Sequence, residues 1–102
     1  MAKVIWTETA LDDLDAIADY IALDKPVAAK HLVQQVFARV EQLAIFPQSG
    51  GKPRELAGTS YRLLVIRPLK IFYRVSGEKV YLVYVMRSEQ QFWLRDVTER
   101  ER

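Results

Sequence analysis

Residues 61–75 read YRLLVIRPLKIFYRV, and this stretch decides the fold. Its Val, Ile, Leu, Phe and Tyr residues favour β-strands. Three such runs follow one another in the second half of the chain: Tyr61–Ile66, Leu69–Val75 and Val80–Met86. The links between them, Arg67-Pro68 and Ser76–Lys79, are short enough for antiparallel hairpins. The second half of the chain therefore predicts three consecutive antiparallel strands.

The first half of the chain predicts one strand followed by two helices. Lys3–Trp6 is a short β-branched and aromatic run, and Thr7 or Thr9 after it offers a helix cap. Apolar residues recur at helical spacing up to Lys25-Pro26, and again from there to Phe46-Pro47. The first helix ends before Pro26 because the residue preceding a proline avoids the α region, whereas proline suits the start of the next helix. Two long helices with so short a link predict an antiparallel hairpin.

These elements together predict an α+β fold. We expect an N-terminal strand followed by an antiparallel two-helix hairpin that packs on one face of a small antiparallel β-sheet. Residues 1–102 are expected to form a single domain, of which 88–102 are a charged C-terminal tail. Within this tail, Glu89–Val97 predict a short helix and Thr98–Arg102 a solvated, mobile end.

Side chains alternate along each strand, which assigns them to the two faces of the sheet. We expect the wholly apolar sets to face the helices: Leu63, Val65, Leu69, Ile71, Tyr73, Val75, Val80, Leu82, Tyr84 and Met86. The opposite face then gathers four cations with two apolar residues, namely Arg62, Lys70, Arg74, Arg87, Leu64 and Phe72. This face would be a cationic, partly apolar groove. The alternative is a solvated face whose arginines pair with Glu55, Glu89 or Asp96.

The distribution of charge also suggests that the second half of the chain binds a partner. The formal net charge is +2, but residues 1–50 hold four cations against seven anions, and residues 51–102 hold eleven cations against six anions. A basic half suggests an anionic partner on that side.

The composition excludes several classes of protein. The 102 residues contain no cysteine, which excludes disulfides and thiolate metal sites, and the single His31 makes other metal sites improbable. We therefore predict no metal and no cofactor. No apolar run approaches the ~20 residues of a membrane span, and Met1–Trp6 is too short for a secretory signal. A cytoplasmic protein without membrane contact is expected.

Several short motifs cover nearly the whole chain. They are Trp6-Thr7 with Ala10-Leu11, Leu14, Ile17 and Tyr20-Ile21; Ala28-Ala29; Leu43, Phe46-Pro47 and Gly50; Glu55-Leu56 with Tyr61-Arg62; and Ile71–Val75 with a last strand ending at Arg87. In this order and spacing they resemble the toxins of the RelE/ParE superfamily of bacterial toxin–antitoxin proteins. The resemblance implies the fold predicted above and a poison held silent by a cognate antitoxin protein.

The resemblance leaves two targets open, since ParE-type members inhibit DNA gyrase and RelE-type members cleave mRNA on the ribosome. The long, regular helix hairpin favours the ParE type, so we expect a gyrase inhibitor. In the RelE type, basic catalytic groups would correspond to Arg62, Lys70, Arg74 and Arg87, and Phe92 or Trp93 would stack on a base. The usual Gly-Arg after the Phe-Pro motif is replaced here by Gly50-Gly51-Lys52, which puts the role of that position in doubt.

RNA cleavage also requires a general base, which the sequence does not identify clearly. Glu55 and Glu89 are candidates, whereas His31 lies on the second helix, away from the predicted groove. A third reading is a basic module that binds nucleic acid without toxicity.

The candidate surface for a target or an antitoxin comprises Arg62, Leu64, Lys70, Phe72, Arg74, Arg87, Phe92 and Trp93. A disordered acidic and apolar antitoxin segment would fold onto this groove and add a strand to an open edge of the sheet. The expected partners are thus a cognate antitoxin and DNA gyrase, or alternatively the ribosome and its mRNA.

Overall fold

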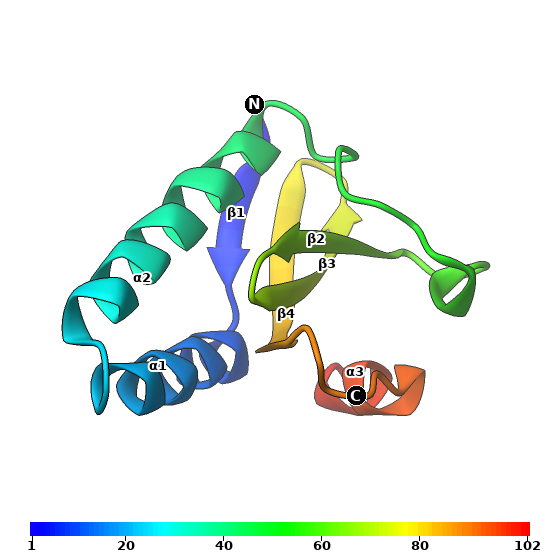
Figure 1. Cartoon of the computed structure of the whole chain (residues 1–102). Helices are drawn as coiled ribbons and strands as arrows, with labels where there is room; N and C mark the ends of the chain where they lie inside the picture. The colour runs from blue at the N-terminus through cyan, green and yellow to red at the C-terminus, as the bar shows by residue number, and fades with distance from the viewer.

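The predicted helix hairpin is present in the computed structural model, which describes residues 1–102. Helix α1 spans Glu8–Ala22, and the Thr7 hydroxyl caps it by accepting a hydrogen bond from the Ala10 backbone N–H at 3.3 Å. Helix α2 spans Pro26–Glu41, with Pro26 at its first position, and continues into a short 3₁₀ turn, η1 (Gln42–Ala44). Figure 1 shows the two helices on one side of the sheet. No helix combines the length and the apolar character that a membrane span requires.

The sheet has four strands in the order β1-β4-β3-β2. The strands are β1 (Lys3–Trp6), β2 (Tyr61–Ile66), β3 (Leu69–Ser76) and β4 (Lys79–Arg87). The last three form the predicted antiparallel meander, and β1 adds to β4 in parallel. The main core lies between this sheet and the helix hairpin and includes Leu14 and Val36 from the helices and Ile71 and Leu82 from the strands.

The predicted face assignment for β2 is wrong. Ile66 pairs with Leu69 across the two-residue turn, and directly paired residues share a face of the sheet. Leu64 and Ile66 therefore face the helices together with Leu69 and Ile71, and both are buried in the main core. Leu63 and Val65 point to the opposite side. Side chains alternate between the two faces along β2 as predicted. The two-residue turn, however, determines which residues of β2 and β3 pair with each other.

The predicted face assignment for the end of β4 is also wrong, because of a β-bulge. Phe72 pairs with Tyr84 while the next residue, Tyr73, pairs with Leu82, so Val83 is an extra residue without a partner. A bulge places two successive residues on the same side and inverts the alternation beyond it. Tyr84 and Met86 consequently lie away from the helix hairpin, whereas Arg87 lies on the helix side.

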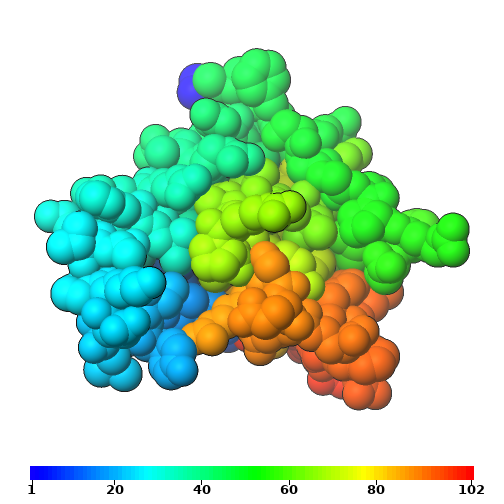
Figure 2. All heavy atoms as spheres, viewed as in Figure 1, coloured from blue at the N-terminus to red at the C-terminus, as the bar shows by residue number.

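The sheet face opposite α1 and α2, here called the far face, is not open. The C-terminal helix α3 (Leu94–Arg100) and a short 3₁₀ helix, η2 (Arg54–Leu56), lie against it (Figure 1). They form a second core in which Leu56 and Val97 are fully buried and Phe72 is 1% exposed. The expectations of a sheet covered on one side only and of a mobile end at Thr98–Arg102 are both wrong. In Figure 2 the C-terminal residues pack against the body of the protein.

Candidate functional site

The structure divides the predicted cationic groove between the two faces of the sheet. Lys70, Phe72 and Arg74 lie on the far face, as expected. Arg62 and Arg87 lie on the helix side, because they pair with Tyr73 and Leu69, which face the helices. The expected grouping of all four cations on one face is therefore wrong. Leu64 and Phe72 are buried, each in a different core, so neither side chain is exposed to a partner.

A cavity of about 340 Å³ opens on the far face beside Lys70. Phe72 and Phe92 line it, and their rings stack with centroids 4.3 Å apart. The Lys70 ammonium donates a hydrogen bond to the Gln90 carbonyl at 3.0 Å, and the carboxylates of Glu55 and Glu89 also line the cavity. This far-face cavity thus brings together one predicted cation, the predicted aromatic Phe92 and both candidate bases.

Arg74 lies at the other end of the far face, in a polar cluster with the C-terminus. Its Nε donates to both carboxylate oxygens of Glu101, at 2.8 and 2.9 Å, and its guanidinium stacks 4.4 Å from the centroid of the Tyr81 ring. The Tyr61 hydroxyl donates to the same carboxylate at 2.7 Å. The charge of Arg74 is therefore already neutralised within the chain.

The ionisation of this cluster follows from its contacts. Burial by itself would raise the pKa of Glu101, but the hydrogen bonds from Arg74 and Tyr61 outweigh it and lower that pKa. Burial and the bond to Glu101 raise the pKa of Tyr61 to about 12. The hydrogen bond to Glu101 also raises the pKa of Arg74. The cluster therefore holds one carboxylate, one guanidinium and one neutral phenol at neutral pH.

The two cations on the helix side lie at opposite ends of the sheet. Arg62 donates to the backbone carbonyls of Gly50 and Gln48, at 3.1 and 3.3 Å, in the loop after η1. Arg87 lies with its guanidinium 4.4 Å from the centroid of the Tyr20 ring of α1 and 3.9 Å from a carboxylate oxygen of Glu89. The main core separates these two side chains.

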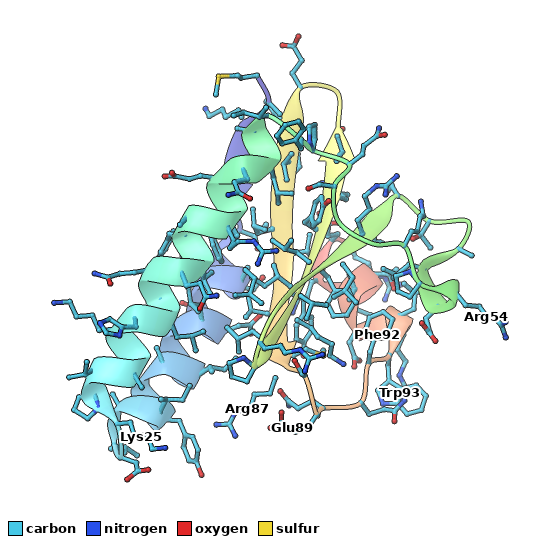
Figure 3. The ribbon with its side chains drawn as sticks, turned by 45° about the horizontal axis from the view of Figure 1, so that its top comes forward. Lys25, Arg54, Arg87, Glu89, Phe92 and Trp93 are labelled. Atoms are coloured by element: carbon cyan, nitrogen blue, oxygen red, sulfur yellow. The ribbon has the colours of Figure 1, made fainter.

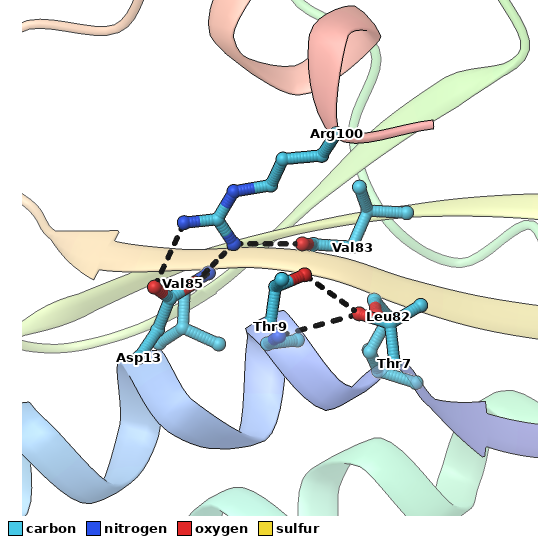
Figure 4. A network of polar contacts seen from close by, with 8 residues as sticks. Thr7, Thr9, Asp13, Leu82, Val83, Val85 and Arg100 are labelled. Carbon is cyan, nitrogen blue, oxygen red and sulfur yellow. Dashed lines mark hydrogen bonds and ion pairs between the residues drawn. The ribbon is translucent and has the colours of Figure 1, made fainter. Parts of the chain in front are cut away.

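Side chains cap the part of β4 that extends beyond β1. Arg100 donates to both oxygens of Asp13, at 2.6 and 2.9 Å, and to the Val83 carbonyl at 3.1 Å. Asp13 in turn accepts the Val85 backbone N–H at 3.0 Å (Figure 4). The bond to Asp13 is the main cause that raises the pKa of Arg100. This edge of the sheet is thus closed to an added strand.

Sequence analysis missed Asp13, Arg100, Glu101 and Tyr61 as members of polar clusters. One signal was available, since Leu94 and Val97 lie three residues apart and would place two apolar side chains on one side of a helix. Nothing in the sequence indicated which acidic residue would form an ion pair with Arg100.

The remaining predicted residues lie near the start of α3. Phe92 packs on the sheet, whereas Trp93 is 52% exposed and lies 5.5 Å from the guanidinium of Arg95. Figure 3 shows Phe92 and Trp93 on the same side of the molecule as Arg54, and Arg87 with Glu89 nearer to α1.

His31 is exposed on α2. No three His, Cys, Asp or Glu side chains lie together in a way that would hold a metal ion.

The fold and the residue pattern match one toxin family. A family profile described as "ParE toxin of type II toxin-antitoxin system, parDE" covers residues 4–92. The chain belongs to this ParE toxin family. A curated relative, "Toxin RelE2" of Caulobacter vibrioides, is 36% identical over 85 residues, which are 83% of this chain and 93% of that protein. The RelE/ParE-like toxin fold inferred from the sequence is thereby confirmed.

A solved structure supports the same assignment. The structure titled "Chromosomal ParDE TA system from P. aeruginosa" superposes with a TM-score of 0.74 at 30% identity, over 87% of this chain and 98% of that chain. The segment matched by the ParE profile ends at residue 92, before α3 begins at Leu94. The helix that covers the far face thus lies outside the segment that the profile matches.

Proposed function

We propose that this ParE-family toxin inhibits DNA gyrase in the bacterial cytoplasm and is neutralised by a cognate antitoxin protein. A gyrase inhibitor needs a complementary surface but no catalytic groups of its own. A ribonuclease that uses the 2′-hydroxyl of RNA needs groups for proton transfer and for stabilisation of the phosphate charge around one phosphate. The distribution of the arginines bears on this choice.

The observation that carries the proposal is the separation of Arg62, Arg74 and Arg87. Arg62 pairs with Tyr73 and Arg87 with Leu69, and these partners are four residues apart on β3. At a rise of ~3.3 Å per residue, that is about 13 Å along the strand alone. Arg74 lies on the far face, bonded to Glu101. Three cations so arranged do not converge on a single phosphate.

The test uses one preparation of the toxin in two assays. We expect loss of supercoiling by purified gyrase and intact mRNA on translating ribosomes. Cuts at defined positions in ribosome-bound mRNA, with gyrase unaffected, would contradict the proposal. Expression of the toxin alone should arrest growth, and co-expression of a small protein from the neighbouring reading frame should restore it. Harmless expression of folded protein would favour a non-toxic binding module instead.

A second candidate function is RelE-like cleavage of mRNA on the ribosome. Its specific support is the far-face cavity, where Lys70 lies with Glu55 and Glu89 beside the Phe92 ring. In this function a carboxylate would accept the proton of the 2′-hydroxyl, and Lys70 would stabilise the phosphate charge. Lys70→Ala and Glu55→Gln would then abolish cleavage, whereas gyrase inhibition would not require a proton-transferring group there.

The structure changes the expected binding site of the antitoxin. Because α3 already covers the far face, an antitoxin segment would meet α3 and its surroundings rather than Phe72. One edge available for an added strand is that of β2, where Leu63 exchanges two backbone hydrogen bonds with Gly51 and Val65 beyond it is exposed. Mixing the toxin with the antitoxin should protect the Val65 amide from hydrogen exchange. Unchanged exchange at Val65 would place the antitoxin elsewhere.

A further inference from the structure

A cavity larger than that on the far face lies beside the turn that joins α1 and α2. Its volume is about 520 Å³, and its apolar lining includes Ile17 and Ile21 of α1 and Pro68 of the β2–β3 turn. A neighbouring cavity of about 380 Å³ shares Ile17 and Tyr20 with it. We call the two together the tip groove. Figure 2 shows a notch between the helix tip, in blue and cyan, and the orange segment after β4.

An exposed apolar residue projects directly beside the tip groove. Leu23, which follows the last residue of α1 and also lines the groove, is 85% exposed. Tyr20 and Val27 on either side of it are exposed as well. An apolar side chain next to an apolar cavity forms a surface that fits a second copy of itself, because a two-fold axis between them places each projection in the other's cavity.

The charged residues around the tip groove also suit contact with a second copy of the chain. Asp24 lies next to Lys25, and Arg87 lies 3.9 Å from Glu89, so the rim carries two cations and two anions. A strongly acidic or strongly basic partner would find as many like charges as opposite ones. In a two-fold contact, by contrast, Asp24 of one copy can face Lys25 of the other, and the reverse.

We propose that the tip groove is the interface of a homodimer, in which Leu23 of each copy inserts into the groove of the other. Neither the gyrase proposal nor the ribonuclease alternative requires this dimer. A standard interface buries about 800 Å² per partner and 20–30 residues a side. That area is roughly an eighth of the 6511 Å² accessible surface of this chain. The tip groove offers fewer residues, so we expect a weak, reversible dimer.

The test is sedimentation velocity on the isolated chain, prepared by cell-free synthesis, over roughly 1–500 µM. We expect a monomer–dimer equilibrium, which Leu23→Asp shifts to monomer by at least ~10-fold in dissociation constant, as expected for a residue at the centre of an interface. The matched control is Ile45→Asp, because Ile45 is an apolar residue of similar chemistry, 60% exposed, that does not line the tip groove. This control should dimerise like the wild type. Both substitutions are at exposed positions, and circular dichroism verifies folding.

A charge exchange tests the geometry of the contact. Asp24→Lys alone and Lys25→Asp alone should each weaken the dimer, and the double variant Asp24→Lys/Lys25→Asp should restore it. A chain that stays monomeric at the highest concentration overturns the proposal, and so does a dimer insensitive to Leu23→Asp. If the chain is monomeric and Leu23→Asp instead weakens binding of the purified antitoxin, the tip groove belongs to the antitoxin.

Discussion

Arg100 and Asp13, separated by 87 positions in the sequence, form an ion pair with N–O distances of 2.6 and 2.9 Å. The pair joins the C-terminal helix α3 to helix α1 across the edge of β4. Arg100 also lies over the Tyr84 ring, 3.5 Å from its centroid. Through these contacts α3 covers the far face and buries Phe72 and Val97.

The first prediction concerns this ion pair. Asp13→Ala removes the acceptor of the Val85 N–H and leaves the partly buried Arg100 without its carboxylate. We expect a loss of about 1–3 kcal/mol in the free energy of unfolding, because a polar group deprived of its partner retains its desolvation cost. Urea denaturation measures it. Asp12→Ala, at an exposed neighbouring position of α1, should change stability by less than ~0.5 kcal/mol.

The second prediction concerns the dependence of stability on acid. The pKa of Glu101 is lowered in the folded protein, so its stabilising effect is complete above its ordinary value of 4.5. This effect is lost as the pH falls through the lower folded pKa. Glu101→Gln should therefore be less stable than the wild type at pH 7, and the difference should narrow below pH 4.5. A constant difference down to pH 2 would show that the carboxylate charge is not responsible.

The third prediction concerns alkaline pH. The pKa of Tyr61 rises from 10.0 to about 12 on folding, so the neutral phenol is stabilised. Its contribution is fully present below pH 10 and is lost as the pH rises towards 12. Burial also raises the pKa of Tyr73. Absorbance titration should therefore show two tyrosines ionising late, and Tyr61→Phe should remove one of them. A late ionisation of unchanged amplitude in Tyr61→Phe would contradict the prediction.

The fourth prediction concerns the glycine pair after the Phe-Pro motif. The Gly50 N–H donates to the Tyr73 hydroxyl at 2.8 Å, and a Cβ on Gly50 would lie only 2.5 Å from that oxygen. Gly50→Ala should therefore destabilise the protein by ~1–3 kcal/mol through overpacking. A Cβ on Gly51 would meet only the Leu63 carbonyl, at 3.9 Å, which makes Gly51→Ala the matched control. Equal melting temperatures for the two variants would contradict the prediction.

The fifth prediction rests on the proposed function and concerns Trp93. An exposed tryptophan beside an arginine has the chemistry of a binding hot spot. Trp93→Ala should raise the concentration needed to inhibit gyrase by ~30-fold, equivalent to about 2 kcal/mol, without changing the melting temperature. Phe46→Ala, which removes another exposed aromatic ring, is the control and should inhibit normally. Full activity of Trp93→Ala would place the target contact elsewhere.

The sequence by itself determined the four strands, the helix hairpin and their order. It misplaced the C-terminal helix, which was expected at Glu89–Val97 and spans Leu94–Arg100. Thr7 and Pro26 start the two helices, and Arg67-Pro68 separates β2 from β3 as expected. The second turn lies where it was expected but is shorter, because Ser76 ends β3 and Lys79 starts β4. These features depend on neighbouring residues only, because capping, proline geometry and side-chain alternation act within a few positions. The α+β fold could therefore be predicted from the residues alone, and the motifs that resemble the ParE family could be read directly in the sequence.

Only the tertiary structure decided which side chains share a face and which charges meet. The pairing of Ile66 with Leu69 moved Arg62 and Leu64 to the helix side, and the bulge at Val83 moved Arg87 there as well. A shift of one residue in strand matching inverts every face beyond it, and no single strand encodes that matching. The folding back of α3 likewise depends on Arg100 meeting Asp13 and on Glu101 meeting Arg74. Such contacts join residues far apart in the chain, so their partners are set by the packed fold.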